Sequence, residues 1–513
     1  MSINEISILD RWIVLAKLKY ILSDKSLDKI DVDTLIVPVI SENNKPRIPE
    51  EIRDAYRELI DTIISSGDFK GEEKEVIIGY SRNRIKRLVL AGLGKEPDHE
   101  TFREAVASAI NSIAEKQSVH AGLYLRDLKN IFEISDLIDN SVLTIEITLF
   151  DPGELFKTEN KKLTLKEMVL IVDNISEDME NALKRSTIIS DAVNYARRIA
   201  ETPSSTMNPA RIEEEAKKLA EQYGLEIKVF QKEDLEKMGM NGILAVGSGG
   251  GIPPRLIILE YRGRNSNEWD YAFVGKTVTF DAGGLNLKPT GYIDNMKYDK
   301  CGGAVVLGIM KAVAELKLPV NVVAALPAVE NLPGPNAYKP RDVIKMYNGL
   351  TVEVGNTDAE GRLILADALS YIDKNYTPKQ IFDLATLTGA IVIALGNYAA
   401  GLFTENDEVA KKLYDIGWKI GERVWHMPLW KEYYEQLKSN IADTNNIGGR
   451  PAGAITAAAF LSKFVSDKKR WIHLDIAGVS FVEKGYPKKA YYKPAATGFG
   501  VRLLTYYLLK DLE

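Results

Sequence analysis

Hydrophobic and polar positions follow one another along the chain in blocks that predict strands and helices in turn. Short apolar runs at 33–40 (DTLIVPVI) and 87–94 (RLVLAGLG) are typical of buried strands, and residues 101–116 have the spacing of an amphipathic helix. We also expect strands at 141–150 (SVLTIEITLF) and 163–172 (LTLKEMVLIV). The first ~175 residues therefore predict a small α/β domain.

One long helix is predicted over 176–201, and the Pro- and Ser-containing segment ETPSSTMNP that follows it is typical of a domain entrance. Beyond residue 203 a second and larger alternation of strands and helices begins. Its strand-like segments are ILAVGSGGG, RLIILEYRG, YAFVGKTVTF, VNVVAALPAV, QIFDLATL and WIHLDIAG, and its helical ones are GGAVVLGIMKAVAELK and ADALSYIDKNY.

Alternation of this kind favours a mostly parallel sheet with helices on both of its faces. We therefore predict a two-domain α/β protein. Its smaller N-terminal α/β domain spans 1–175, a linking helix spans 176–202, and a larger C-terminal α/β domain spans 203–513.

The composition is that of a core-forming soluble protein, with 45% hydrophobic and 27% charged residues, and it excludes a mostly disordered or fibrous chain. Lys and Arg number 66 against 72 Asp and Glu, so the net charge is −6. Such a chain has no built-in attraction for nucleic acid or anionic membranes. The longest apolar runs fall far short of the ~20 residues of a membrane helix. Residues 1–20 lack the apolar core of a signal peptide, so we expect a cytoplasmic location.

Cysteine and histidine are too scarce for the common zinc motifs. Cys301 is the only cysteine, which excludes an intramolecular disulfide and a cysteine-based zinc cage. The four histidines are too far apart in sequence to form a local metal motif. Any bound metal would therefore be held mainly by oxygen ligands.

Candidate chemistry begins in the segment 271–303. Asp281 follows a predicted buried strand, where ligands bind in open α/β sheets, and Gly283-Gly284 would let the backbone approach a ligand closely. Asp281 could instead merely cap the next turn. Lys276 lies inside the same apolar strand, where an ammonium group is costly unless it is paired or neutralised. A structural ion pair and a metal-ligating amine both remain open.

The segment 355–372 (GNTDAEGRLILADALSYI) carries further acids. Thr357 and Glu360 fit a capping box that precedes an amphipathic helix. Alternatively, Asp358 and Glu360 could face one side of an extended segment, with Arg362 beside them. Dense carboxylates without histidine suit Mn²⁺, Mg²⁺ or Zn²⁺ on oxygen. Four acids are enough to offset two divalent ions, namely Asp281, Asp299, Asp358 and Glu360.

Together the segments FVGKTVTFDAGGLNLKP, NMKYDKCGGA and NTDAEGRL resemble the signature blocks of the leucine aminopeptidases (cytosol aminopeptidase, peptidase family M17). RLVLAGLGK, GGRPAGAITAAAFL and ATGFGVRLL extend the resemblance over nearly the whole chain. It implies a metal-dependent enzyme that releases N-terminal amino acids from peptides through a two-metal-activated water. It also implies that residues 203–513 form the catalytic domain, and that the protein is a homohexamer acting on peptides with a free N-terminus.

The resemblance also implies roles for individual residues. The tight metal would be held by Lys276, Asp281, Asp299 and Glu360. The exchangeable metal would be held by Asp281, Asp358 and Glu360. Lys288 and Arg362 would be catalytic without contacting the metals, with a bicarbonate at Arg362. The substrate pocket, expected to prefer Leu- or Met-like residues, would be lined by Met296, Thr386, Leu387 and Gly389.

The chain departs from the family pattern at four places. Lys300 stands where Met is usual, Gly303 replaces an Ala, Thr277 replaces the commoner Gly, and Ala282 replaces Ser or Thr. These departures leave the side-chain preference and the metal affinity open, and Mn²⁺ and Zn²⁺ are the expected metals. Two alternative functions are a hydrolase of special dipeptides of the Cys-Gly type and an oligomeric DNA-binding accessory protein.

Overall fold

The structure, a computed structural model, describes residues 18–512 except for residues 115, 158–163 and 484. The signal-peptide expectation for residues 1–20 therefore lies almost entirely outside the described residues. None of the helices in the described ranges is long and apolar enough to cross a membrane.

The chain forms two compact units. Of the described residues, the first unit comprises those up to 191 together with 488–493, and the second comprises those of 192–487 and 494–512. The division falls inside the long helix α5 (Glu177–Glu201). The presence of this helix confirms the helix predicted over 176–201.

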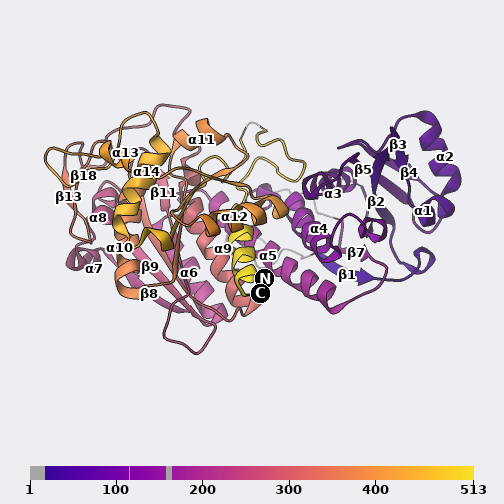
Figure 1. Ribbon diagram of the computed structural model, residues 1–513, viewed down its shortest axis with the longest axis horizontal. Helices are drawn as coiled ribbons and strands as arrows, with labels where there is room; N and C mark the ends of the chain where they lie inside the picture. Colours follow the sequence, from indigo (N-terminus) through magenta and orange to yellow (C-terminus); the bar gives the residue numbers. More distant parts are fainter. Residues whose placement is uncertain (1–17, 115, 158–163, 484, 513) are drawn as a thin grey trace. The chain divides into compact units, whose positions relative to one another are not determined.

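The first unit contains, in its described residues, a mixed seven-stranded sheet (Figure 1). Its strands are β1 (Lys19–Ser23), β2 (Thr34–Glu42), β3 (Lys45–Arg47), β4 (Val76–Tyr80), β5 (Arg87–Gly94), β6 (His120–Tyr124) and β7 (Glu167–Ile171). Its helices besides α5 are α1 (Glu50–Ala55), α2 (Arg57–Ser66), α3 (His99–Ala114) and α4 (Ile134–Leu149). The strand order is β1-β7-β6-β2-β5-β4, with β3 beside β2. Only β3 and β4 pair antiparallel with their neighbours.

The second unit contains a nine-stranded sheet and a separate three-stranded sheet among its described residues. The strands are β8 (Glu226–Phe230), β9 (Arg255–Arg262), β10 (Tyr271–Gly275), β11 (Thr277–Asp281), β12 (Asn321–Asn331), β13 (Val343–Lys345), β14 (Thr351–Glu353), β15 (Gln380–Ala385), β16 (Ala400–Phe403), β17 (Val424–His426), β18 (Thr444–Asn445) and β19 (Trp471–Asp475). The helices are α6 (Pro209–Tyr223), α7 (Lys232–Met238), α8 (Asn241–Gly247), α9 (Cys301–Leu316), α10 (Gly361–Tyr376), α11 (Gly389–Leu395), α12 (Asp407–Ile420), α13 (Lys431–Glu435), α14 (Gly453–Leu461) and α15 (Val501–Leu512).

The centre of the large sheet is parallel, as predicted. The order is β17-β16-β19-β15-β10-β12-β9-β8, and β19, β15, β10 and β12 all run parallel to their neighbours within this group. Antiparallel pairs occur at β9, β8 and β16. The sheet is therefore mixed but mostly parallel, which confirms the predicted fold class.

Helices cover both faces of this sheet. Successive side chains of β10 point to opposite faces and therefore pack against different helices. Ala272 and Val274 belong to an apolar core that includes Leu365 of α10. Phe273, between them, stacks on Phe382, whose ring meets Tyr507 of α15 on the other face. Burial on both faces explains why β10 and the interior of β12 are continuous apolar runs in the sequence.

Two predicted strands are wrong. The segment 141–150 lies in helix α4, and the apolar residues at the start of 243–251 lie in helix α8. Both helices pack their apolar residues into a buried core, and this packing outweighs the strand preference of the β-branched residues in 141–150.

The strand predicted over 271–280 is interrupted at Lys276. β10 pairs with β15 and β12, whereas β11, which follows Lys276, pairs with β12 alone. At the break the amide of Lys276 donates to Leu384 O (3.0 Å), and its carbonyl accepts from Gly303 N (2.8 Å). Lys276 therefore occupies a bend where the chain leaves one strand neighbour, and Asp281 is the last residue of β11.

Candidate active site

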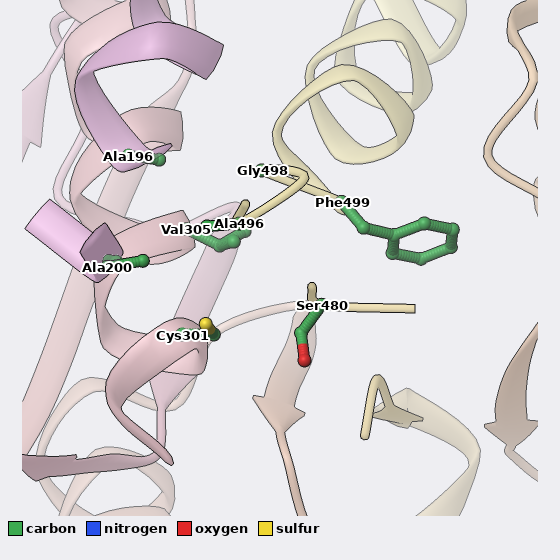
Figure 2. Close-up of a pocket in the computed structure, with 9 residues that line it drawn as sticks. Ala196, Ala200, Cys301, Val305, Ser480, Ala496, Gly498 and Phe499 are labelled. Carbon is green, nitrogen blue, oxygen red and sulfur yellow. The ribbon is translucent and has the colours of Figure 1, made fainter. Parts of the chain in front are cut away.

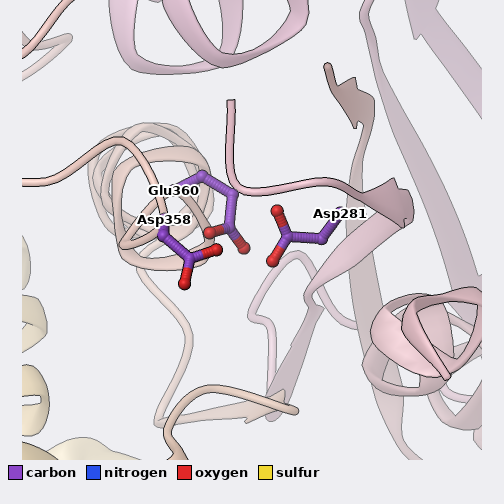
Figure 3. A group of neighbouring side chains, drawn as sticks. All are labelled: Asp281, Asp358 and Glu360. Atoms are coloured by element: carbon purple, nitrogen blue, oxygen red, sulfur yellow. The ribbon is translucent and has the colours of Figure 1, made fainter. Parts of the chain in front are cut away.

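Three carboxylates converge beside the end of β11 (Figure 3). Asp281 ends that strand, while Asp358 and Glu360 come from the loop that precedes α10. One oxygen from each of the three lies within 4.8 Å of the other two. Asp281 and Glu360 are buried and Asp358 is half-buried. Such a cluster of oxygen ligands is suited to a divalent cation.

The turn after Asp281 requires glycine. Gly283 and Gly284 have φ values of +89° and +64°, a left-handed conformation that side chains rarely adopt. Asp281 Oδ1 accepts hydrogen bonds from Gly283 N (2.9 Å) and from Asn331 Nδ2 (2.8 Å). Asp281 does cap the turn, as the simpler interpretation expected, but its Oδ2 remains directed at Lys288 (2.9 Å).

The capping-box interpretation of residues 357–360 is wrong. Helix α10 begins at Gly361 with Glu360 at its N-cap, and no side chain caps it. The Thr357 hydroxyl donates to Gly283 O (2.7 Å) and accepts from Asn286 N (2.9 Å). Thr357 therefore joins the two acid-bearing loops to each other rather than starting the helix.

Lys276 is enclosed by predicted metal ligands. Its Nζ lies 2.6 Å from Asp299 Oδ1 and 2.8 Å from Glu360 Oε1, and it donates to Thr386 O (2.9 Å). Burial alone would lower the pKa of Lys276, but the two carboxylates raise it well above its usual value. The ion pair that the structural interpretation expected is present. The same position leaves the amine within reach of any cation that these carboxylates bind.

One buried carboxylate oxygen of Asp299 accepts no hydrogen bond from the described residues. Asp299 belongs to the 3₁₀ turn Met296–Lys300, and its Oδ1 accepts from the hydroxyl of Thr386 (2.8 Å). Its Oδ2 has no hydrogen-bond partner among the described residues. A buried carboxylate oxygen left unpaired costs roughly 1–3 kcal/mol or more. The residues present therefore fit a bound divalent metal.

Lys288 contacts the carboxylates directly. Its Nζ lies 2.9 Å from Asp281 Oδ2 and 2.5 Å from Asp358 Oδ1, and its side chain is 14% exposed. Burial alone would lower the pKa of Lys288, but Asp281 and the other acids raise it above its usual value. The ammonium group is thus held at the edge of the acidic cluster.

Arg362 is buried in the first turn of α10. Its Nη1 donates to Asn446 O (2.6 Å), and its Nε has no partner among the described residues. Burial lowers the pKa of Arg362 to about 10, so the guanidinium is still charged at neutral pH. A buried cation with a donor to spare is suited to a small anion such as bicarbonate.

The predicted pocket residues lie on two segments. Met296 begins the turn that carries Asp299, and it is half-buried. Thr386 and Leu387 follow β15, and the amide of Leu387 donates to Asp475 Oδ1 (3.2 Å). A Cβ at Gly389, the first residue of α11, would meet no atom within 4 Å, so space lies in front of it.

Thr386 has a closer connection to the site than its pocket assignment suggested, because it contacts both Lys276 and Asp299. Sequence reasoning also missed Asn331, which is fully buried and donates to Asp281 Oδ1 and to Thr357 O (3.1 Å). Its place at the end of the strand beside β11 is the only sequence signal that could have indicated it.

Lys300 is fully buried, and its ammonium group donates to the carbonyl of Lys297 rather than to Asp299. Burial lowers the pKa of Lys300 to about 7, which reduces the positive charge that this departure from the family pattern would add. The turn that contains Lys300 is anchored by Glu201, which accepts from Lys297 Nζ (3.0 Å) and from Tyr298 Oη (3.1 Å).

The departures at Thr277 and Gly303 compensate each other. A Cβ on Gly303 would lie 2.2 Å from Thr277 Oγ1 and 2.9 Å from its Cγ2. The threonine side chain therefore occupies the space that an alanine methyl at 303 would need. Gly361 has a similar constraint, since a Cβ there would lie 2.4 Å from Lys276 Cε.

A cavity of about 10 Å³ lies behind Cys301 (Figure 2), with room for about one water molecule. Burial raises the pKa of Cys301 to about 12, so the thiol is unreactive at neutral pH. The cavity is too small for an amino-acid side chain and is not the predicted substrate pocket. It is lined by Ala196, Ala200, Cys301, Ala304, Val305, Ser480, Ala496, Gly498 and Phe499.

Two family profiles match the chain. The "Cytosol aminopeptidase family, catalytic domain" matches residues 194–505, and the "Cytosol aminopeptidase family, N-terminal domain" matches residues 36–138. The chain belongs to the cytosol aminopeptidase family. This confirms the resemblance to the leucine aminopeptidases, peptidase family M17. The chain is therefore a hydrolase of the peptidase class, in a family of metal-dependent N-terminal aminopeptidases.

Individual relatives match over almost their whole length. A "Probable cytosol aminopeptidase" of Chloroherpeton thalassium is 39% identical over 508 residues, covering 95% of this chain and 98% of the relative. One of Chlorobaculum tepidum is 42% identical over 459 residues, covering 85% and 90%.

Two solved structures show the same fold. A mutant of tomato leucine aminopeptidase superimposes with a TM-score of 0.86 at 31% identity, covering 96% of this chain and 97% of that one. The bottromycin maturation enzyme BotP in complex with Mn gives a TM-score of 0.80 at 28% identity, covering 94% and 100%.

Proposed function

We propose that the chain is a leucyl aminopeptidase that uses two divalent metal ions to hydrolyse the first peptide bond of peptides with a free N-terminus. The observation that carries this proposal is the convergence of Asp281, Asp358 and Glu360 within 4.8 Å beside the ion pair of Lys276 with Asp299.

In this proposal Asp281 and Glu360 would supply ligands to both metal sites, which is a bridging role. Lys276 and Asp299 would complete the tight site, and Asp358 would complete the exchangeable one. Carboxylate oxygens with one nitrogen donor suit Mn²⁺ or Zn²⁺, and the unpaired Oδ2 of Asp299 supports a further bond there. Manganese is also the metal in the BotP complex named above.

Two bound divalent ions would lower the pKa of an attacking water and polarise the scissile carbonyl. Lys288 lies at the edge of the acidic cluster, where its ammonium group can donate to the oxyanion as charge develops on the carbonyl oxygen. Arg362 would hold a bicarbonate that acts as general base, using its Nε, which has no hydrogen-bond partner among the described residues.

The proposed specificity has two parts. A free and neutral α-amine is required for binding to a metal, so N-terminal residues are selected over internal ones. Met296, Thr386 and Leu387, with the open space at Gly389, would form an apolar pocket for a Leu- or Met-like side chain. A homohexamer in the cytoplasm, with residues 176–202 as the helix that links the two domains, completes the proposal.

Metal removal followed by reconstitution tests the function. Exhaustive chelation should abolish hydrolysis of leucine amide, and Mn²⁺, Co²⁺ or Zn²⁺ should restore it. A panel of aminoacyl amides, assayed together with Cys-Gly, would then show the preferred first residue. A metal-free preparation with full activity would overturn the metal-dependent mechanism, and activity on Cys-Gly alone would overturn the leucyl specificity.

A further inference from the structure

Asn446 lies directly after β18 and is fully buried. The strand pairs parallel with β14, and the amide of Asn446 extends this pairing by donating to Glu353 O (3.0 Å). At its start the strand is fixed by Asp443, whose Oδ2 accepts from Thr351 N and Oγ1 (both 2.8 Å). The backbone of Asn446 is thus held in register before its side chain makes any contact.

Both the amide oxygen and the amide nitrogen of the Asn446 side chain form hydrogen bonds with the loop that leads to Asp358 and Glu360. Oδ1 accepts from Gly355 N (2.7 Å) and Asn356 N (3.3 Å). Nδ2 donates to Asn356 O (2.8 Å) and Ala359 O (3.3 Å). The four contacts enclose residues 355–359, the segment from which the Asp358 carboxylate projects into the cluster.

The backbone carbonyl of the same residue accepts from Arg362 Nη1 (2.6 Å). One buried residue, contributed by a segment 84–91 positions further along the chain, therefore contacts the loop of a predicted metal ligand and the guanidinium of a predicted catalytic residue. We propose that Asn446 is a positioning residue for the peptidase reaction. It fixes the Asp358 carboxylate and the Arg362 guanidinium relative to each other. This inference rests on the roles proposed above for Asp358 and Arg362.

Groups that orient metal ligands without touching the metal typically contribute 10–100-fold in metal affinity or activity. Asn446→Asp keeps the shape of the side chain but replaces two donors by an oxygen that would face two carbonyls. The loop would then have to move away, and Asp358 would move with it. We expect a 10–100-fold weaker affinity for the second metal per chain and a similar loss of kcat, with a smaller change in KM.

Asn321 provides a matched control. It is also fully buried, its Oδ1 accepts from Arg264 N (3.3 Å), and its Nδ2 donates to Ser266 O (2.8 Å) and Glu268 O (2.9 Å). It holds a loop that carries none of the predicted site residues. Asn321→Asp should lower the midpoint of thermal unfolding while leaving metal affinity and kcat unchanged.

The experiment compares the wild type, Asn446→Asp, Asn446→Ala and Asn321→Asp as full-length proteins. Calorimetric titration of the metal-free proteins with Mn²⁺ gives the affinity and the number of sites, and leucine amide hydrolysis at saturating Mn²⁺ gives kcat and KM. Asn446→Ala removes the side chain without adding a charge, so it carries the test if Asn446→Asp does not fold.

Selective loss of the second Mn²⁺ and of kcat in the Asn446 variants is the expected result. The proposal is overturned if a folded variant keeps wild-type affinity and kcat, if Asn321→Asp loses both equally, or if neither Asn446 variant folds. If the wild type binds Mn²⁺ but does not hydrolyse peptides, the proposed function fails, whereas the titration alone still tests the role of Asn446.

Discussion

Replacement of Lys288 by alanine distinguishes two roles for an ammonium group that contacts two carboxylates. Lys288 Nζ lies 2.9 Å from Asp281 and 2.5 Å from Asp358, and its side chain is mostly buried. In one role the lysine donates to the developing oxyanion. In the other it only neutralises surplus negative charge.

The two roles predict different effects of Lys288→Ala on kcat and on the stability of the unliganded protein. Loss of an oxyanion donor typically lowers kcat by ~10²–10³, which corresponds to ~2.7–4 kcal/mol. Loss of one partner of a buried ion pair typically costs ~3–5 kcal/mol in the stability of the unliganded protein. Since Lys288 competes with a cation for Asp281 and Asp358, its removal should also tighten metal binding.

We expect Lys288→Ala to bind two metals per chain at least as tightly as the wild type and to have a kcat ~10²–10³ lower at saturating metal. Metal titration followed by kcat at saturation is the assay. Lys379→Ala is the control, because Lys379 also lies between two carboxylates, Glu268 and Asp270 (3.1 and 3.2 Å), but is 56% exposed. An unchanged kcat for Lys288→Ala at saturating metal would refute the donor role.

Three further predictions follow from the site and from the first unit. Asp281→Asn should lower the number of bound metals and the activity together, whereas Asp358→Asn should mainly empty the exchangeable site; two tight metals and a normal rate in Asp281→Asn, measured by elemental analysis and kinetics, would contradict the bridging role. N-acetylated leucine peptides should resist cleavage wherever the free peptides are hydrolysed, and internal cleavage of a blocked peptide, seen by mass spectrometry, would contradict exopeptidase specificity. Burial alone would raise the pKa of Glu100, but Arg103 and Lys489 lower it from 4.5 to about 2. A carboxyl with a lowered folded-state pKa stabilises the fold above its unfolded pKa and loses that contribution as the pH falls toward 2. Glu100→Gln should therefore destabilise the protein at pH 7 by at most ~3 kcal/mol, and urea unfolding should show this difference shrinking between pH 5 and pH 2; a difference independent of pH would contradict it.

The parallel strands around the site were the easiest part of the fold to predict. β12 is buried on both faces, so its residues 322–329 form a continuous apolar run, whereas β15 and β19 are as buried but contain Asp383 and His473. Asp281 could be placed for the same reason, since a functional carboxylate at a strand end follows from the topology alone.

The helix α4 shows why the segment 141–150 was mistaken for a strand. The helix begins at Ile134, and the residues that it places in the apolar core, Leu137, Ile138, Val142 and Ile145, show the helical period only when the positions before 141 are included. Within the helix the hydroxyls of Ser141 and Thr148 donate to the carbonyls four residues before them. These bonds satisfy polar groups that would otherwise disfavour a buried helix.

Asn446 and Thr386 could not be assigned their contacts from sequence. Asn446 contacts a loop ~90 residues earlier, and Thr386 contacts Lys276 110 residues earlier. A single asparagine or threonine produces no periodic pattern, so tertiary packing alone determines what it touches.

The contact between Thr277 and Gly303 makes these two positions epistatic. Gly303→Ala alone would place a methyl group 2.2 Å from the hydroxyl oxygen of Thr277. The same change together with Thr277→Gly would remove the side chain that the methyl group meets. The effects of the two substitutions should therefore not add. Starting from the pair in this chain, Thr277→Gly must precede Gly303→Ala, whereas the reverse exchange must begin at position 303, so the order in which the two residues diverged is constrained by the width of a single methyl group.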